Sequence, residues 1–138
     1  MEGWETVSKA VIYASTFGKT RKTAKYLADQ LGADTFDLKK QMLINMAEYD
    51  HIVLGSGIHA GKPYKRLVEF IGNNKGELSK KRVSLFLCCK FNDEKGAAQC
   101  RNIADEFGIS DATFFSGRGD KNPDGFEVAL DEYVSRLR

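Results

Sequence analysis

A segment near the start of this chain combines glycine, hydroxyl and basic residues in an order suited to holding an anion. Ser15-Thr16-Phe17-Gly18-Lys19-Thr20 follows an apolar run and precedes a helical pattern. Gly18 lets the backbone approach an anion, and the first amides of a helix attract negative charge. Ser15, Thr16 and Thr20 add hydroxyl donors. The segment predicts a phosphate site, although the same residues would also make an ordinary strand-to-helix turn with Thr20 as the cap.

A second glycine-containing segment, Gly55-Ser56-Gly57-Ile58-His59-Ala60-Gly61, is expected to form a loop after a strand. Three glycines in seven residues would allow the backbone to pack against a flat ring. His59 would stack on such a ring or donate to it, and otherwise would be a solvated loop histidine. Lys62 follows near the expected start of a helix, where a cation opposes the helix dipole. That mismatch indicates an anionic ligand, or simply a solvated lysine.

Two common phosphate-binding motifs are excluded. Gly18-Lys19-Thr20 matches the end of a Walker A loop, but that motif needs a glycine five positions before Gly18, where Tyr13 stands. A dinucleotide-binding Gly-x-Gly-x-x-Gly is absent because Ser15 and Phe17 occupy the neighbourhood where its glycines would be needed. Neither triphosphate nor dinucleotide binding is therefore expected.

The cysteines favour neither a disulfide framework nor a zinc site. Cys88, Cys89 and Cys100 make an odd count without a Cys-x-x-Cys spacing. Cys88 and Cys89 are neighbours on an expected strand, so their side chains point to opposite faces and a disulfide between them would be strained. We expect buried structural thiols, no metal site and a cytoplasmic protein.

Composition and charge limit the remaining classes of protein to which this chain could belong. The chain has 138 residues, is 42% hydrophobic and carries a formal net charge of +2. This length predicts a single domain, residues 1–138. The small net charge does not indicate nucleic acid binding, and no apolar run is long enough for an integral membrane segment. The first nine residues lack the pattern of a secretory signal.

Apolar runs alternate with helical patterns along the whole chain. Strands are expected over 7–14, 33–38, 50–55, 82–89 and 112–116, and helices over 20–31, 63–71, 93–107 and 124–137. Asp124 and Glu127 form a capping-box pattern for the last helix. Five strands alternating with helices predict an α/β fold: a parallel sheet with helices on both faces. In such sheets, ligands bind beyond the carboxyl ends of the strands.

The two glycine-containing segments resemble the flavodoxin-domain family, closest to the branch that includes menaquinone-dependent protoporphyrinogen dehydrogenase. That branch typically shows Tyr-Ala-Ser-x-x-Gly-x-Thr, present here at Tyr13–Thr20, and later Gly-Ser-x-Ile-x-Ala-Gly, present at Gly55–Gly61. Phe115–Asp120 weakly resembles a third signature. The resemblance implies a flavodoxin-like three-layer sandwich with strand order 2-1-3-4-5. It also implies the cofactor FMN at the carboxyl edge of the sheet.

The resemblance assigns three groups of residues to that cofactor. The phosphate would be held by Ser15, Thr16, Phe17, Gly18, Lys19 and Thr20; the flavin ring would be lined by Ser56, Gly57, Ile58, His59, Ala60 and Gly61 and, on its other side, by Cys89, Lys90 and Phe91. No catalytic side chain is assigned. We hypothesise that His59, Lys62 or Lys90 stabilises the anionic reduced flavin and so raises its reduction potential.

The expected function is electron transfer between a reductase or reduced nicotinamide and a protein or small-molecule acceptor. One alternative is a flavin-free binding or regulatory domain of the same fold. A phosphoacceptor receiver domain is excluded, because Ser15 and Ser56 stand where it needs acidic residues. The other alternative is an oxidoreductase of the protoporphyrinogen dehydrogenase type, but the segment 117–124 is shorter than in those members.

Overall fold

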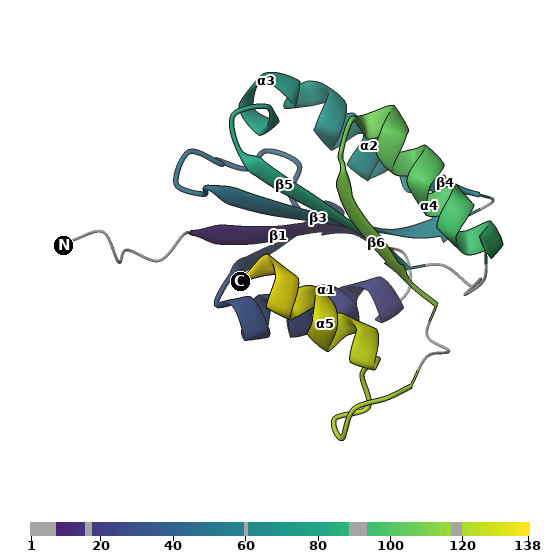
Figure 1. The fold of residues 1–138 in the computed structure, drawn as a ribbon. Coiled ribbons are helices and arrows are strands. Elements are labelled where there is room, and N and C mark those ends of the chain that lie inside the picture. Colours follow the sequence, from purple (N-terminus) through teal and green to yellow (C-terminus); the bar gives the residue numbers. More distant parts are fainter. Residues whose placement is uncertain (1–7, 16–17, 60, 89–93, 117–119) are drawn as a thin grey trace.

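The computed structural model describes residues 8–15, 18–59, 61–88, 94–116 and 120–138. Five parallel strands form its sheet: β1 (Lys9–Ala14), β2 (Asp34–Asp37), β3 (His51–His59), β5 (Arg82–Cys88) and β6 (Asp111–Phe115). Their spatial order is β2-β1-β3-β5-β6 (Figure 1). Counted along the chain this is the order 2-1-3-4-5, so the expected topology is confirmed. A short strand, β4 (Lys62–Pro63), pairs antiparallel with the end of β3.

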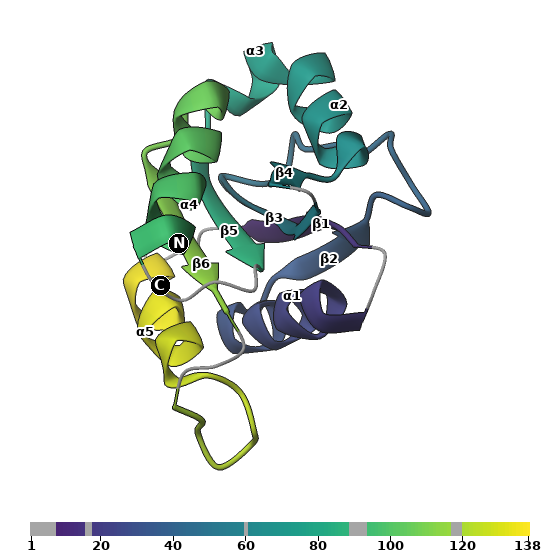
Figure 2. The same cartoon turned by 90° about the vertical axis from the view of Figure 1, so that its right-hand side faces the viewer.

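Helices cover both faces of the sheet (Figure 2). On one face lie α1 (Gly18–Leu31) and α5 (Val128–Leu137). On the other lie α2 (Lys65–Asn73), the short α3 (Lys75–Leu78) and α4 (Glu94–Phe107). Helices α1, α2, α4 and α5 follow strands, so they run roughly back along the strands and begin near the carboxyl edge of the sheet. Helix α3 instead lies directly after the end of α2 and leads into β5.

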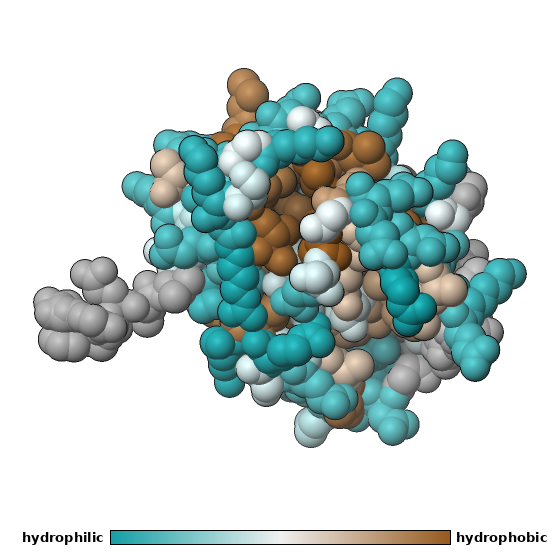
Figure 3. All heavy atoms as spheres, turned by 45° about the horizontal axis from the view of Figure 1, so that its top comes forward, coloured by the Kyte–Doolittle hydropathy of each residue, from teal (hydrophilic) through white to brown (hydrophobic). Residues whose placement is uncertain are grey.

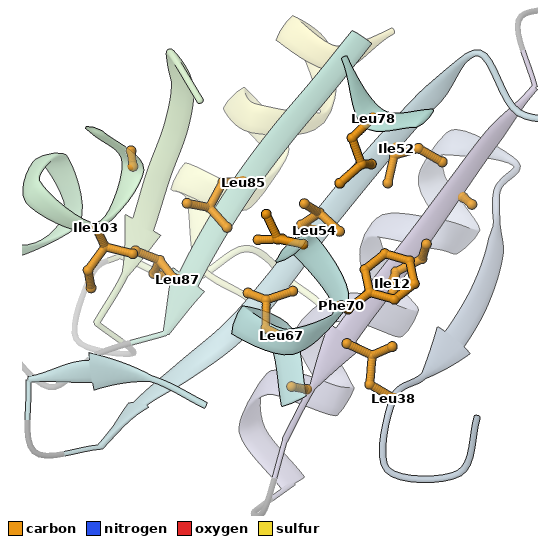
Figure 4. Packing of buried hydrophobic residues seen from close by; sticks show 14 of the residues in the cluster. Ile12, Leu38, Ile52, Leu54, Leu67, Phe70, Leu78, Leu85, Leu87 and Ile103 are labelled. Carbon is orange, nitrogen blue, oxygen red and sulfur yellow. The ribbon is translucent and has the colours of Figure 1, made fainter. Parts of the chain in front are cut away.

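Two hydrophobic cores result from the alternation of side chains along the strands. In β1, Val11 and Tyr13 face the core beneath α1 and α5, whereas Ile12 faces the core beneath α2 and α4. Figure 4 shows the second core, where Ile12 and its neighbours from β3 and β5 meet Leu67 and Phe70 of α2. Each fully buried side chain of this kind contributes about 1.5–3 kcal/mol.

The segment after Gly55 differs from the expected loop. Strand β3 continues without interruption to His59, and a turn at Gly61 leads into β4. Pro63 therefore lies in a strand and not in the first turn of a helix, because α2 begins at Lys65. The glycine-rich segment is thus one arm of a β-hairpin.

The last helix also begins later than expected. It starts at Val128, and the Glu127 side chain makes no capping hydrogen bond, so the capping box was wrong. Asn122 orders the preceding loop instead: its Oδ1 accepts hydrogen bonds from the backbone N–H groups of Asp124 and Phe126, each at 3.0 Å. An asparagine side chain that closes a turn in this way replaces the expected cap.

Lys81 differs from the exposed Lys75 and Lys80 near it. The Lys81 side chain is largely buried beside α3. Its Nζ donates to the backbone carbonyl of Tyr49 at 2.6 Å and lies 3.5 Å from a carboxylate oxygen of Glu77. Lys81 therefore ties α3 to the segment that precedes β3.

Candidate functional site

The register of the sheet brings the predicted ligand segments to one edge. Ala14 of β1 is paired with Ser56 of β3, and Gly57 of β3 is paired with Cys88 of β5. The chain leaves β1 toward β2 on one side, while β3 lies on its other side, so the strand order reverses between β1 and β3. Open α/β sheets bind ligands outside the carboxyl ends of the strands at such a reversal.

The start of α1 lies at this reversal and carries positive charge. Gly18 and Lys19 are exposed in the first turn, which contains no acidic residue. A Cβ atom added to Gly18 would meet no atom within 4 Å, so protein packing does not explain the glycine at this position. Thr20 lies inside the helix and is buried, which excludes it as the cap in front of the helix.

A cavity of about 340 Å³ opens beside the start of α1. Tyr13 and Ser15 line it from the end of β1, and Gly18 and Arg21 from the start of α1. The end of β2 and the residues after it complete the lining with Asp37, Lys39 and Lys40. Three cations and one carboxylate make the cavity positive overall. Small hydroxyl and glycine groups, a helix N-terminus and surplus cations together form a donor set that fits a phosphate group.

The hairpin beyond β3 is held in place by Ser56. This residue has no exposed surface; its Oγ donates to the carbonyl of Gly57 at 2.7 Å and accepts from the N–H of Tyr64 at 3.0 Å. Because both hydrogen bonds are internal, the Ser56 side chain positions the hairpin. Among the described residues of this segment, those that reach the surface are the half-buried Ile58, the exposed His59 and the exposed Gly61.

Gly57 lies beneath the side chains of Tyr64 and Thr20. A Cβ atom at Gly57 would lie 3.0 Å from Cε2 of Tyr64 and 3.2 Å from Oγ1 of Thr20. The absence of a side chain at Gly57 therefore lets Thr20 of α1 and Tyr64, which precedes α2, both pack closely on this strand. The sequence analysis placed this part of the chain in a helix over 63–71, and nothing in the local sequence indicated that Tyr64 would cover Gly57.

Packing alone explains why a glycine occupies position 55. A Cβ atom at this position would overlap the ring of Phe86 on the neighbouring strand β5. Gly55 and Gly57 are therefore each required by a different packing contact: Gly55 by Phe86, and Gly57 by Tyr64 and Thr20. Gly61 differs again: its φ of +79° is the left-handed conformation that glycine adopts most easily, and it forms the tight turn of the hairpin.

Cys88 closes the site from the side of β5. It is buried, and Sγ lies 3.9 Å from Oγ1 of Thr23 in α1. Burial raises the pKa of the Cys88 thiol, while hydrogen bonds from Thr20 and Thr23 oppose that shift. The thiol is therefore protonated at neutral pH and packs as a small apolar group, as expected for a structural cysteine.

The described residues bring together Ser15, Gly18, Lys19, Thr20, Ser56, Gly57, Ile58, His59 and Gly61 at or beneath one edge of the sheet. Thr16, Phe17, Ala60, Cys89, Lys90 and Phe91 lie outside the described residues. Within the described part of the chain, no group of three His, Cys, Asp or Glu side chains is arranged to hold a metal ion. No helix in that part is long and apolar enough to cross a membrane.

A family model described as a flavodoxin domain matches residues 10–130. Over 62 residues the chain is 39% identical to an uncharacterized protein of Methanocaldococcus jannaschii. That match covers 44% of this chain and 41% of the relative, so the aligned part spans less than half of the relative's length.

Solved structures share the fold at low sequence identity. A putative flavoprotein from Bacteroides eggerthii gives a TM-score of 0.66 at 15% identity, with 94% of this chain and 97% of that chain covered. A flavoprotein from Lactobacillus acidophilus in complex with FMN gives 0.58 at 14% identity, with 79% and 90% covered. Rubredoxin oxygen:oxidoreductase from Desulfovibrio gigas gives 0.65 at 14% identity, with 93% of this chain matching 34% of that longer chain.

Proposed function

Since this chain belongs to the flavodoxin-domain family, we propose that it binds FMN at the carboxyl edge of its sheet and transfers electrons. The electrons would pass between a reductase or reduced nicotinamide and a protein or small-molecule acceptor. The observation that carries the proposal is the positive cavity at the start of α1, lined by Ser15, Gly18 and three cations. A structural relative crystallised with FMN supports the choice of ligand.

The phosphate end of FMN would occupy the start of α1. Ser15, Gly18 and Lys19 are the described residues that present hydroxyl, backbone and ammonium groups there, with Thr16, Phe17 and Thr20 completing the proposed segment. The charge of a phosphate is favoured at a helix N-terminus by about 0.3–1 kcal/mol when exposed and by more when partly buried. Thr20 is buried, so its role is to support the segment from beneath.

The flavin ring would lie against the hairpin. Ile58, His59 and Gly61 present apolar, aromatic and backbone surfaces on one side, and we assign Ala60, Cys89, Lys90 and Phe91 to the same ring site. Ser56 and Gly57 would shape it from within. FMN, when bound, supplies one- and two-electron transfer; the chain supplies binding, orientation and charge.

Basic side chains flank the proposed ring site. His59 and Lys62 are paired across the hairpin and both are exposed. A nearby positive charge favours the anionic form of a neighbouring group, so these residues would favour the reduced flavin. That is the arrangement we propose for a flavoprotein poised toward two-electron transfer. We further propose that the chain acts as a single domain in the cytoplasm.

Two other functions compete with electron transfer. The first is a flavin-free binding or regulatory domain, in which the same edge would hold another anion. The second is oxidation of protoporphyrinogen, as in the family branch with similar motifs. The electron-transfer proposal is favoured because it needs only an exposed edge of the flavin, whereas oxidation of protoporphyrinogen needs a second pocket for a bulky substrate.

The absorption spectrum of the purified protein, before and after incubation with FMN, tests the proposal. We expect flavin bands, release of FMN on denaturation, and bleaching when a reductase or reduced nicotinamide is added. Protein that is colourless and also takes up no added FMN would contradict FMN binding. Protein that binds FMN but oxidises protoporphyrinogen at a sustained rate would favour the enzymatic alternative.

A further inference from the structure

A second cavity lies between α2 and α4 and adjoins the proposed flavin site at the hairpin, where Gly61 and Lys62 line it. Its volume is about 790 Å³, within the range of small-molecule sites. Ile103 and Phe107 of α4 form its apolar base, and Pro63 and Val68 form the opposite wall. In the space-filling view that presents this face, hydrophobic residues are visible in a hollow bordered by hydrophilic ones (Figure 3).

The cavity is long. The helices α2 and α4 lie on the same face of the sheet and both begin at its carboxyl edge (Figures 1 and 2). The distance along α4 from Lys95 to Phe107 is about 18 Å at 1.5 Å per residue. Beyond Phe107 a smaller cavity of about 350 Å³ continues between α3 and the start of β6, lined by Ile71, Val83 and Ile109. The shape suits an extended chain better than a flat ring.

Charge is concentrated at one end of this cavity. Lys62, Lys65 and Lys95 line the end beside the hairpin, while the acidic residue among the described lining residues, Glu106, lies in the last turn of α4. The first turn of α2 contains no acidic residue. Lys65 therefore begins a helix whose dipole it opposes, at a cost of a few tenths of a kcal/mol. An anionic group bound there would offset that cost.

The hairpin turn closes the same end. A Cβ atom added to Gly61 would lie 3.3 Å from Nε2 of Gln99, so the turn packs against α4 and blocks the cavity toward the sheet edge. A ligand's charged head would meet the lysines at this closure, and its apolar part would extend over Ile103 and Phe107 toward the smaller cavity.

We propose that the cavity between α2 and α4 binds an amphipathic anion: an aliphatic chain with a carboxylate or phosphate head held by Lys62 and Lys65. This site meets the proposed FMN site at the hairpin, where Gly61 and Lys62 serve both, but its apolar lining on α2 and α4 is not part of the FMN site. It would give the protein a lipid-like ligand on the face that the helices leave partly uncovered.

Calorimetric titration of the full-length protein with dodecanoate, below its micelle concentration and both with and without added FMN, tests the proposal. We expect saturable binding of one molecule in both states, similar binding of dodecyl phosphate, and binding of dodecyltrimethylammonium weakened about tenfold or more. If the protein binds dodecanoate but not FMN, the proposed function is contradicted and the proposed dodecanoate site is not.

Matched variants separate this site from general adsorption. Val68 is 44% exposed and Val128, on α5 at the opposite face, is 40% exposed, so each tolerates a charge without loss of the fold. Val68→Asp is expected to weaken dodecanoate binding about tenfold, and Val128→Asp less than twofold. The double variant Lys62→Gln/Lys65→Gln is expected to weaken dodecanoate binding about fivefold. The control double variant Lys25→Gln/Lys80→Gln, at two exposed lysines that line neither cavity, is expected to leave binding unchanged. Absence of saturable binding, or equal effects of the two valine variants, would overturn the proposal.

Discussion

The backbone N–H of Tyr64 donates a 3.0 Å hydrogen bond to the hydroxyl of Ser56, eight residues earlier in the chain. This contact joins the end of β3 to the start of α2 and fixes the hairpin between them. Ser56 is fully buried, so its loss would leave the Tyr64 donor without its partner in a part-buried position. The shape of the proposed ring site therefore depends on a side chain that has no contact with solvent.

Ser56→Ala is expected to lower the free energy of unfolding by about 1–3 kcal/mol, because removing one partner leaves a buried donor unsatisfied. Urea denaturation followed by circular dichroism measures the change. Ser79→Ala is the control, since the Ser79 hydroxyl donates to Gly76 in an exposed turn; its effect should stay within about 0.5 kcal/mol. Equal effects of the two variants would show that Ser56 does not hold the hairpin.

Adding a methyl group at Gly57 is expected to weaken FMN binding by forcing Tyr64 or Thr20 away from the strand. The neighbouring atoms lie 3.0 and 3.2 Å from the site of the new Cβ, closer than ordinary contact. Gly72→Ala is the matched control: it lies in α2 with open space around it and should stabilise the protein by about 0.5–1 kcal/mol. Unchanged FMN affinity in Gly57→Ala would contradict a role for Tyr64 in shaping the FMN site.

The order and direction of the main strands could be predicted from sequence, because apolar runs such as 82–89 are long enough to indicate strands buried on both faces. The hairpin could not. Gly55 and Gly57 weaken the strand signal, yet each glycine is required by a partner distant in sequence: Phe86 for Gly55, and Tyr64 with Thr20 for Gly57. The residues next to Gly55 and Gly57 in the sequence therefore do not indicate that these glycines lie in a strand.

The candidate site was predictable only in its location. The glycine and hydroxyl residues after β1 indicate a ligand segment because these residue types suit anion binding whatever their tertiary contacts are. The roles within the second segment were not predictable, since Ser56 and Ile58 are close in sequence but one is fully buried and the other reaches the surface. The start of α5 was missed because Asn122, not Asp124, orders the preceding turn.

Because His51 is buried, we expect the folded protein to lose stability in mild acid. The His51 imidazole is fully buried at the opposite edge of the sheet, with Nε2 2.9 Å from Oγ of Ser84, which in turn donates to Asp111 at 2.7 Å. Burial, reinforced by the nearby Arg82 and Lys9, lowers the pKa of His51 to about 4. The unfolded chain takes up the proton near pH 6.5, whereas the folded chain does so only near pH 4.

The contribution of neutral His51 is therefore complete above about pH 6.5 and is lost as the pH falls from about 6.5 to 4. Urea denaturation at a series of pH values should show stability falling through this window by up to about 1.4 kcal/mol per pH unit. His51→Gln should flatten the dependence. The chain's other histidine, His59, is exposed, and His59→Gln should leave the slope unchanged. A slope that persists in His51→Gln would assign it to other groups.

Lys62 is expected to raise the two-electron midpoint potential of bound FMN through its charge. Lys62→Gln should lower this potential by about 10–30 mV, a modest change because the side chain is exposed and screened by solvent. Lys75→Gln, which removes an exposed lysine at the start of α3, is the control. A spectroelectrochemical titration measures both. Equal potentials in the wild type and Lys62→Gln would reject the charge hypothesis for this residue.

The central claim is that the start of α1 binds the phosphate of FMN. Titration of the flavin-free protein with FMN and with riboflavin, followed by the quenching of flavin fluorescence, tests it most directly, because the two ligands differ only in that phosphate. We expect one FMN per chain and an affinity for riboflavin about 100-fold lower, corresponding to about 2.7 kcal/mol. Riboflavin binding within threefold of FMN, or no binding of either, would contradict the claim.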